Sequence, residues 1–171
     1  MNPLLSAIAD GWGWKLGKPV AVVATNPFGN AIVKNDDGKF FRIIPEDLQC
    51  ELLANSVAEL EEKRKERDFI HDWEMTAMVV RAEAALGPLS EGEVYYLVVA
   101  SVLGGKYSEE NIRKISLLEL FGFSGDVAEQ VEGVPPGSRV IFVPMEKEPN
   151  HSTEPTPTSG TSAAGHPPRQ P

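Results

Sequence analysis

The stretch that decides the fold is PVAVVATNPFGNAIVKNDDGKFFRII, residues 19–44. Its first seven residues form a β-branched, apolar run that is typical of a central strand. NPFGN then provides turn chemistry, because Pro27 fixes φ and Gly29 tolerates a positive φ. AIVK follows as a second strand, NDDG at residues 35–38 is a strong hairpin signal, and KFFRII forms the third strand. The stretch therefore predicts an antiparallel meander.

Helical and strand patterns surround this meander. Pro45 fits the first turn of a helix, and an apolar stripe at helical spacing predicts a helix over residues 45–60. Residues 69–86 are predicted to form one further helix, and residues 1–14 a short helix or arm. Serine and glutamate in SLLE, residues 116–119, have the spacing of a capping box that starts a helix. Strands are expected at residues 93–100, 111–115 and 139–143.

These patterns predict an α+β fold, in which an antiparallel β-meander has helices packed on one face and two halves share a core. We expect an N-terminal half over residues 1–86 and a C-terminal half over residues 87–145. From residue 146 onward Pro, Ser and Thr dominate, and apolar residues nearly vanish. Such a segment buries too little surface to offset its ordering entropy, so residues 146–171 are expected to be a disordered tail.

The negative net charge of the chain restricts the classes of partner that it can bind. It carries 16 basic and 25 acidic residues, for a net charge of −9 at pH 7. Only two basic and three acidic residues lie beyond residue 145, so a net charge of −8 belongs to the rest. This charge argues against direct binding of nucleic acid, which depends on neutralising phosphates, and it favours a basic partner. Without a basic leader or an 18-residue apolar run, we expect a cytoplasmic protein that has no membrane partner.

The familiar motifs of enzymes do not match. VLGGKYS at residues 102–108 fails as a phosphate loop, since Ala100 and Tyr107 occupy two of its four defining positions. His71 has no second histidine within a turn of its predicted helix, as a metal site would need. Cys50 is the single cysteine and is expected to be a small buried side chain on the helix of residues 45–60. We therefore assign no catalytic, cofactor-binding or metal-ligating residues and expect that the protein is not an enzyme.

Two blocks carry a family resemblance. WGWKLGKPVAVVATNPFGNAIVKNDDGKFFRIIPEDL, residues 12–48, resembles the GAD-related N-terminal half of bacterial type VI secretion immunity proteins. YYLVVASVLGGKYSEENIRKISLLELFGFSGDVAEQV, residues 95–131, resembles the C-terminal half of the same family. The first block is also similar to the broader SUKH immunity superfamily. Together the resemblance extends over residues 12–143.

The resemblance implies an antitoxin that binds and neutralises a cognate secreted toxin, often a DNase, by stoichiometric inhibition. Acidic residues in predicted turns or helix starts are the expected contacts with a basic nuclease surface, because they face outward without disturbing a core. They are Asp36, Asp37, Glu109 and Glu110. Alternatives are a SUKH-like immunity protein against another toxin class, an enzyme that reverses toxin damage, and a small-molecule-binding module with tryptophans lining its pocket.

Overall fold

The computed structural model describes residues 2–141 and residue 143. Helix α1 (Pro3–Leu16) begins at Asn2, whose side chain accepts a hydrogen bond from the backbone N–H of Leu4 at 2.9 Å. The helix ends at Gly17, whose positive φ of 80° suits a residue without a Cβ. The chain then turns directly into the sheet.

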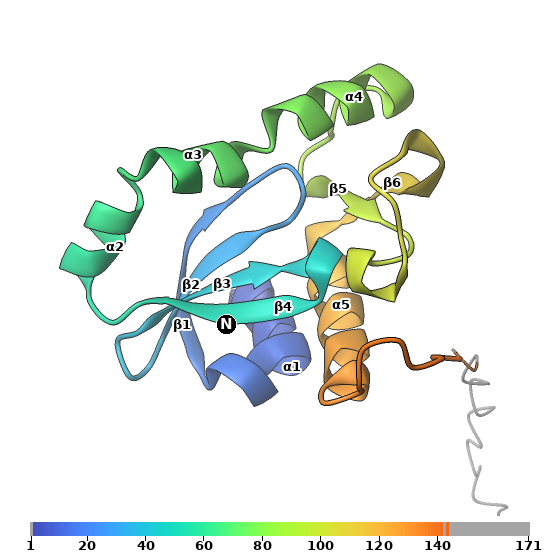
Figure 1. The fold of residues 1–171 in the computed structure, drawn as a ribbon. Helices are drawn as coiled ribbons and strands as arrows, with labels where there is room; N and C mark the ends of the chain where they lie inside the picture. Colours follow the sequence, from blue (N-terminus) through green and yellow to red (C-terminus); the bar gives the residue numbers. More distant parts are fainter. Residues whose placement is uncertain (1, 142, 144–171) are drawn as a thin grey trace, which may run out of the picture. The chain divides into compact units, whose positions relative to one another are not determined.

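The sheet is a four-stranded antiparallel meander in the order β1-β2-β3-β4 (Figure 1). Its strands are β1 (Pro19–Thr25), β2 (Ala31–Asn35), β3 (Phe40–Ile44) and β4 (Gln49–Ala54), and every neighbouring pair is antiparallel. The predicted turn of residues 26–30 is closed by Asn26, whose side-chain oxygen accepts hydrogen bonds from the N–H groups of Phe28 and Asn30. The first three predicted strands and both turns are therefore confirmed.

The predicted helix over residues 45–60 is wrong except at residues 57–60, which begin a later helix. One 3₁₀ turn, η1 (Pro45–Asp47), is followed by Leu48 in the left-handed conformation with φ 52°, which reverses the chain into β4. Cys50 lies on this strand opposite Ile43 and is buried. Pairing with β3 satisfies the backbone of this segment and outweighs its helical pattern.

The predicted helix over residues 69–86 is two helices. Three helices follow the sheet: α2 (Val57–Lys63), α3 (Arg67–Glu74) and α4 (Thr76–Leu86). The break lies at Met75, which has φ 48°. Asn26 stabilises it, because its side-chain amide donates to the carbonyl of Trp73 at 2.8 Å. A contact 47 residues away in sequence therefore ends the helix.

The remaining elements form the second part of the fold. Strands β5 (Glu93–Leu97) and β6 (Ile112–Ser116) pair antiparallel, with short 3₁₀ turns η2 (Ser101–Leu103) and η3 (Glu109–Asn111) between them. Helix α5 (Leu117–Val131) starts as predicted, since the Ser116 hydroxyl accepts from the N–H of Glu119. The strand expected at residues 139–143 is wrong, because residues 139–141 and 143 form no strand and Ile141 is 72% exposed. The expected disordered tail of residues 146–171 lies outside the described residues.

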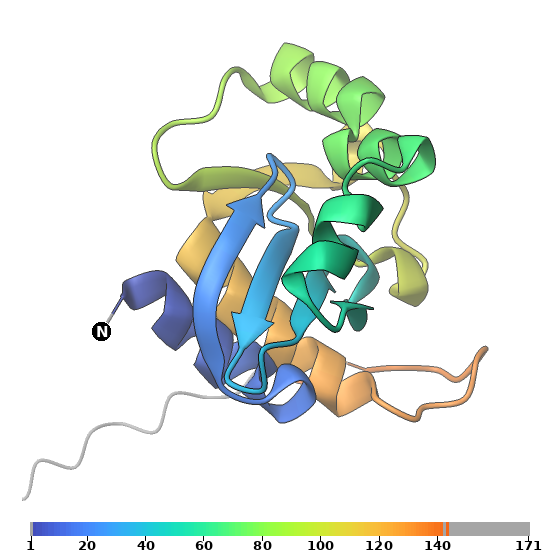
Figure 2. The same cartoon turned by 90° about the vertical axis from the view of Figure 1, so that its left-hand side faces the viewer.

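Helices α1 and α5 pack together on one face of the sheet, which confirms the expected α+β arrangement (Figures 1 and 2). The two helices meet at Gly11 and Gly125, which we call the helix crossing. A Cβ added at either glycine would overlap the backbone of the opposite helix. Trp12, fully buried beside this contact, donates from its indole nitrogen to Ser124 at 3.3 Å. A further apolar cluster packs α2 and α3 against the sheet from the other side.

Candidate functional site

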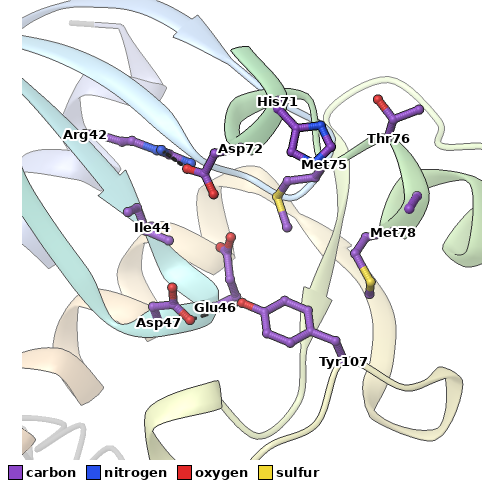
Figure 3. A pocket seen from close by; sticks show the side chains of 11 residues that line it. Arg42, Ile44, Glu46, Asp47, His71, Asp72, Met75, Thr76, Met78 and Tyr107 are labelled. Carbon is purple, nitrogen blue, oxygen red and sulfur yellow. Dashed lines mark hydrogen bonds and ion pairs between the residues drawn. The ribbon is translucent and has the colours of Figure 1, made fainter. Parts of the chain in front are cut away.

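A cleft of about 370 Å³ opens between η1 and the junction of α3 with α4 (Figure 3). Carboxylates and thioether side chains meet in it, which gives it charged and apolar walls. The lining residues are Arg42, Ile44, Glu46, Asp47, His71, Asp72, Met75, Thr76, Ala77, Met78 and Tyr107. Below, "the cleft" refers to this hollow.

Glu46 is the buried acid of the cleft. The η1 turn holds it only 5% exposed, and its two carboxylate oxygens accept from the side-chain amide of Asn30 at 2.9 and 2.8 Å. Burial raises the pKa of the Glu46 carboxyl to about 7, against the smaller opposing effects of the Asn30 hydrogen bond and the Arg42 charge. Glu46 is therefore poised to change its protonation state near neutral pH.

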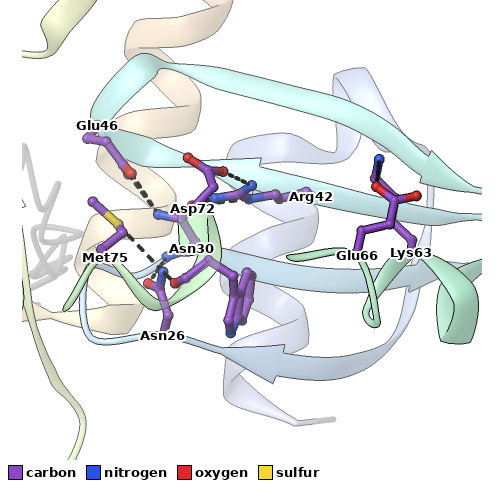
Figure 4. A network of polar contacts seen from close by, with 9 residues as sticks. Asn26, Asn30, Arg42, Glu46, Lys63, Glu66, Asp72 and Met75 are labelled. Atoms are coloured by element: carbon purple, nitrogen blue, oxygen red, sulfur yellow. Dashed lines mark hydrogen bonds and ion pairs between the residues drawn. The ribbon is translucent and has the colours of Figure 1, made fainter. Parts of the chain in front are cut away.

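Arg42 ties helix α3 to the sheet (Figure 4). Its Nε and Nη2 donate to the Asn30 side-chain oxygen at 3.3 and 2.8 Å, and its Nη1 forms an ion pair with Asp72. The guanidinium also lies 5.6 Å from the ring centres of both Phe69 and Trp73. Asn30 thus links the buried cation and the buried acid, and its amide is fully hydrogen-bonded between them.

Asp47 connects the cleft to the second part of the fold. It accepts hydrogen bonds from the hydroxyls of Ser101 and Tyr107, the latter at 3.1 Å. Burial, reinforced by the neighbouring Asp47 charge, raises the pKa of Tyr107, so the phenol remains a hydrogen-bond donor at physiological pH. The cleft is therefore built from both parts of the chain.

A family model matches a segment that begins at the end of the sheet. Residues 54–128 match the model described as T6SS immunity protein Tdi1, C-terminal. This segment is similar to the C-terminal part of type VI secretion immunity proteins. It runs from the last residue of β4 into α5 and supplies Asp72 and Tyr107 to the cleft, whereas Arg42, Glu46 and Asp47 precede it. The match confirms the type VI secretion resemblance.

Comparison with solved structures adds a likeness at the level of the fold. The crystal structure of Atu4351 from Agrobacterium tumefaciens aligns with a TM-score of 0.49 and 18% sequence identity, over 74% of this chain. The alignment covers 65% of that protein, so the present chain spans less than two thirds of its length. The search among curated proteins gave no match.

The four acidic residues singled out as toxin contacts are exposed in two separate turns. Asp36 and Asp37 lie in the tight turn between β2 and β3, and Glu109 and Glu110 begin η3. Figure 1 shows these turns on opposite sides of the view, so the structure does not bring the two pairs together. A hydrogen bond from Ser108 lowers the pKa of Glu110 and, with the nearby Arg81 and Lys106, favours its charged form. Their contact with a toxin stays a prediction.

Sequence reasoning missed Glu46 and Asp47, because Pro-Glu-Asp at residues 45–47 fits a helix start. Their pairing with Asn30, Ser101 and Tyr107 depends on the fold and has no local signal.

The other reactive side chains have structural surroundings. Cys50 is buried, and burial raises the pKa of its thiol to about 12, which keeps it in the unreactive protonated form. His71 is exposed at the rim of the cleft. Within residues 2–141 and 143, no three His, Cys, Asp or Glu side chains are grouped to hold a metal ion. In the same part of the chain, no helix is long and apolar enough to cross a membrane.

Proposed function

We propose that this immunity protein neutralises a cognate type VI effector with DNase activity by forming a stoichiometric complex through its acidic surface. It acts in the cytoplasm as a binding protein rather than an enzyme, and it makes no direct contact with DNA. The observation that carries the proposal is the match to the immunity family on a chain whose net charge is −8 before residue 146.

Electrostatics supports this partner. A nuclease domain must present basic side chains to hold the phosphates of its substrate. An acidic inhibitor is therefore steered toward the same surface and competes with DNA for it. The exposed pairs Asp36–Asp37 and Glu109–Glu110 supply charge of the required sign at the surface.

The proposal also includes the division of the chain. Residues 1–86 would form the GAD-related half, residues 87–145 the immunity half and residues 146–171 the tail. Because the family match begins at residue 54, limited proteolysis of the full chain is the appropriate check. Early cleavage near residue 86 supports this boundary, and early cleavage near residue 54 contradicts it.

Protection assays test the function itself. The toxin domain is expressed in cells with and without the immunity protein, and the purified toxin is titrated with it in a DNA-cleavage assay. Binding predicts that cleavage stops at an equimolar ratio and that the two proteins co-elute in gel filtration. Protection at a small fraction of the toxin concentration would instead identify an enzyme that reverses the damage. Unchanged cleavage at excess immunity protein would contradict the proposal.

A further inference from the structure

The carboxylate of Glu46 is buried, and the cleft opens beside it. Among the described residues, the side-chain amide of Asn30 is its only side-chain donor. An ionised carboxylate offers about four acceptor positions, and a buried one without donors carries a large desolvation cost. Glu46 lines the cleft, and Figure 3 shows its carboxylate directed into the space below Met75.

The charged groups around this carboxylate leave the cleft acidic. Asp47 lies beside Glu46 on η1, and Asp72 faces the hollow from α3. Arg42 is the cation of the cleft, but Asp72 is already its ion-pair partner. Exposed His71 stands at the rim, and Tyr107 is uncharged. An incoming cation thus meets two carboxylates that no cationic side chain of the described residues pairs with.

The remaining wall is apolar and adaptable. Met75 and Met78 line the side opposite the η1 turn, and methionine side chains adjust easily to the shape of a partner. Lysine and arginine bury their aliphatic stems along such surfaces while their charged ends reach polar groups. A volume of about 370 Å³ is also many times that of a water molecule.

We propose that the cleft receives one arginine or lysine side chain of the toxin, with Glu46 and Asp47 binding its cationic end and the two methionines covering its stem. The inference rests on the proposed function and locates a central contact for it. Arginine is the better fit, because its planar guanidinium pairs with two carboxylates at once. None of the four acidic residues that sequence reasoning selected lines this cleft.

A binding role and a structural role of Glu46 predict different results. An uncharged glutamine at this position removes a buried charge, so Glu46→Gln should raise the melting temperature at pH 8. The same substitution should lower toxin affinity by a factor of ten or more, as expected when a central buried charge pair loses one partner. A purely structural residue would not lower affinity while stability rises.

Calorimetric titration of the toxin domain provides the test, using the full-length wild type, Glu46→Gln and Asp47→Asn at pH 6 and pH 8. Asp126→Asn is the control, because it removes one exposed charge from α5 outside the cleft. We expect wild-type affinity to rise between pH 6 and pH 8 as Glu46 ionises, and this gain to disappear in Glu46→Gln. Asp47→Asn should also weaken binding, and the control should bind within about twofold of wild type.

The outcomes separate the two proposals. If wild type binds and both cleft variants bind equally well at each pH, the cleft is not the contact and only this inference fails. If wild type itself does not bind the toxin, the proposed function fails and this inference with it.

Discussion

The helix crossing and the cleft each join segments that lie far apart in the sequence, but by opposite means. At the crossing, Gly11 and Gly125 bring backbone against backbone, and buried apolar residues surround the contact. In the cleft, Arg42, Glu46 and Asp72 place charges between the sheet and α3. Close apolar packing stabilises a fold, whereas buried charges contribute little or lower its stability. We therefore expect the crossing to stabilise the fold, and the cleft is the place where we propose that the toxin binds.

The largest effect is expected at the crossing. Gly125→Ala places a methyl group onto the backbone of Gly11, so the helices must separate, and we expect a loss of more than about 3 kcal/mol in the free energy of unfolding. Gly122→Ala on the same helix is the matched control, because nothing lies within 4 Å of its added Cβ. It should gain up to about 1 kcal/mol from helix propensity. Urea denaturation measures both, and equal stabilities of the two variants would refute close packing at the crossing.

The next largest effect is expected in the cleft, where a substitution should stabilise the protein instead of destabilising it. The folded pKa of Glu46, raised from 4.5 to about 7, means that the folded state binds the extra proton between these values. The contribution of Glu46 to the free energy of unfolding is therefore greatest below about pH 4.5. It falls by up to about 3 kcal/mol as the pH rises to 7. Glu46→Gln should remove this decline and be the more stable protein at pH 8. Thermal unfolding at several pH values checks it, and a parallel pH profile for both proteins would count against a buried, ionising Glu46.

A smaller effect distinguishes packing from charge at Arg42. Truncation to alanine removes its contacts with Phe69 and Trp73 and leaves the buried oxygen of Asn30 without these donors, which should cost about 2 kcal/mol. Asp72→Asn should cost less than about 1 kcal/mol, because the Asp72 side chain is 69% exposed and its ion pair is screened by solvent. Chemical denaturation of the two variants gives the comparison. Equal losses of unfolding free energy in the two variants would show that the ion pair, and not the packing of Arg42, stabilises the position of α3.

The same contrast explains what the sequence could predict. The meander between residues 19 and 44 could be predicted from local rules. Its strand segments alternate with turn residues such as Asn35 and Gly38, and this order is nearly sufficient to specify the hairpins. The helix over residues 45–60 was wrong because its apolar stripe fits a helix, whereas Leu48, a non-glycine residue with φ 52°, turns the chain back to pair with β3. The break at Met75 depends on Asn26, and the cleft depends on Asn30 and Tyr107, all distant in sequence. Tertiary contacts of this kind leave no periodic signal, so Glu46 was missed while exposed acids were selected.

The smallest effect on stability is expected at those exposed acids. The double reversals Asp36→Lys with Asp37→Lys, and Glu109→Lys with Glu110→Lys, should each change the free energy of unfolding by less than about 0.5 kcal/mol, because all four side chains are exposed. At least one of the two should slow association with the toxin, since rim charges act mainly on the on-rate. Stopped-flow kinetics measures this. If neither reversal slows association, these turns lie outside the interface.

The central claim is that an acidic surface of this chain binds the toxin, and a salt series tests it most directly. Titration calorimetry of the full-length protein against the toxin domain is run at low and at high ionic strength, with both double reversals in parallel. Our account predicts a one-to-one complex whose affinity falls as salt rises, and a smaller fall in at least one reversal. Affinity that is unchanged by salt and by both reversals would contradict it.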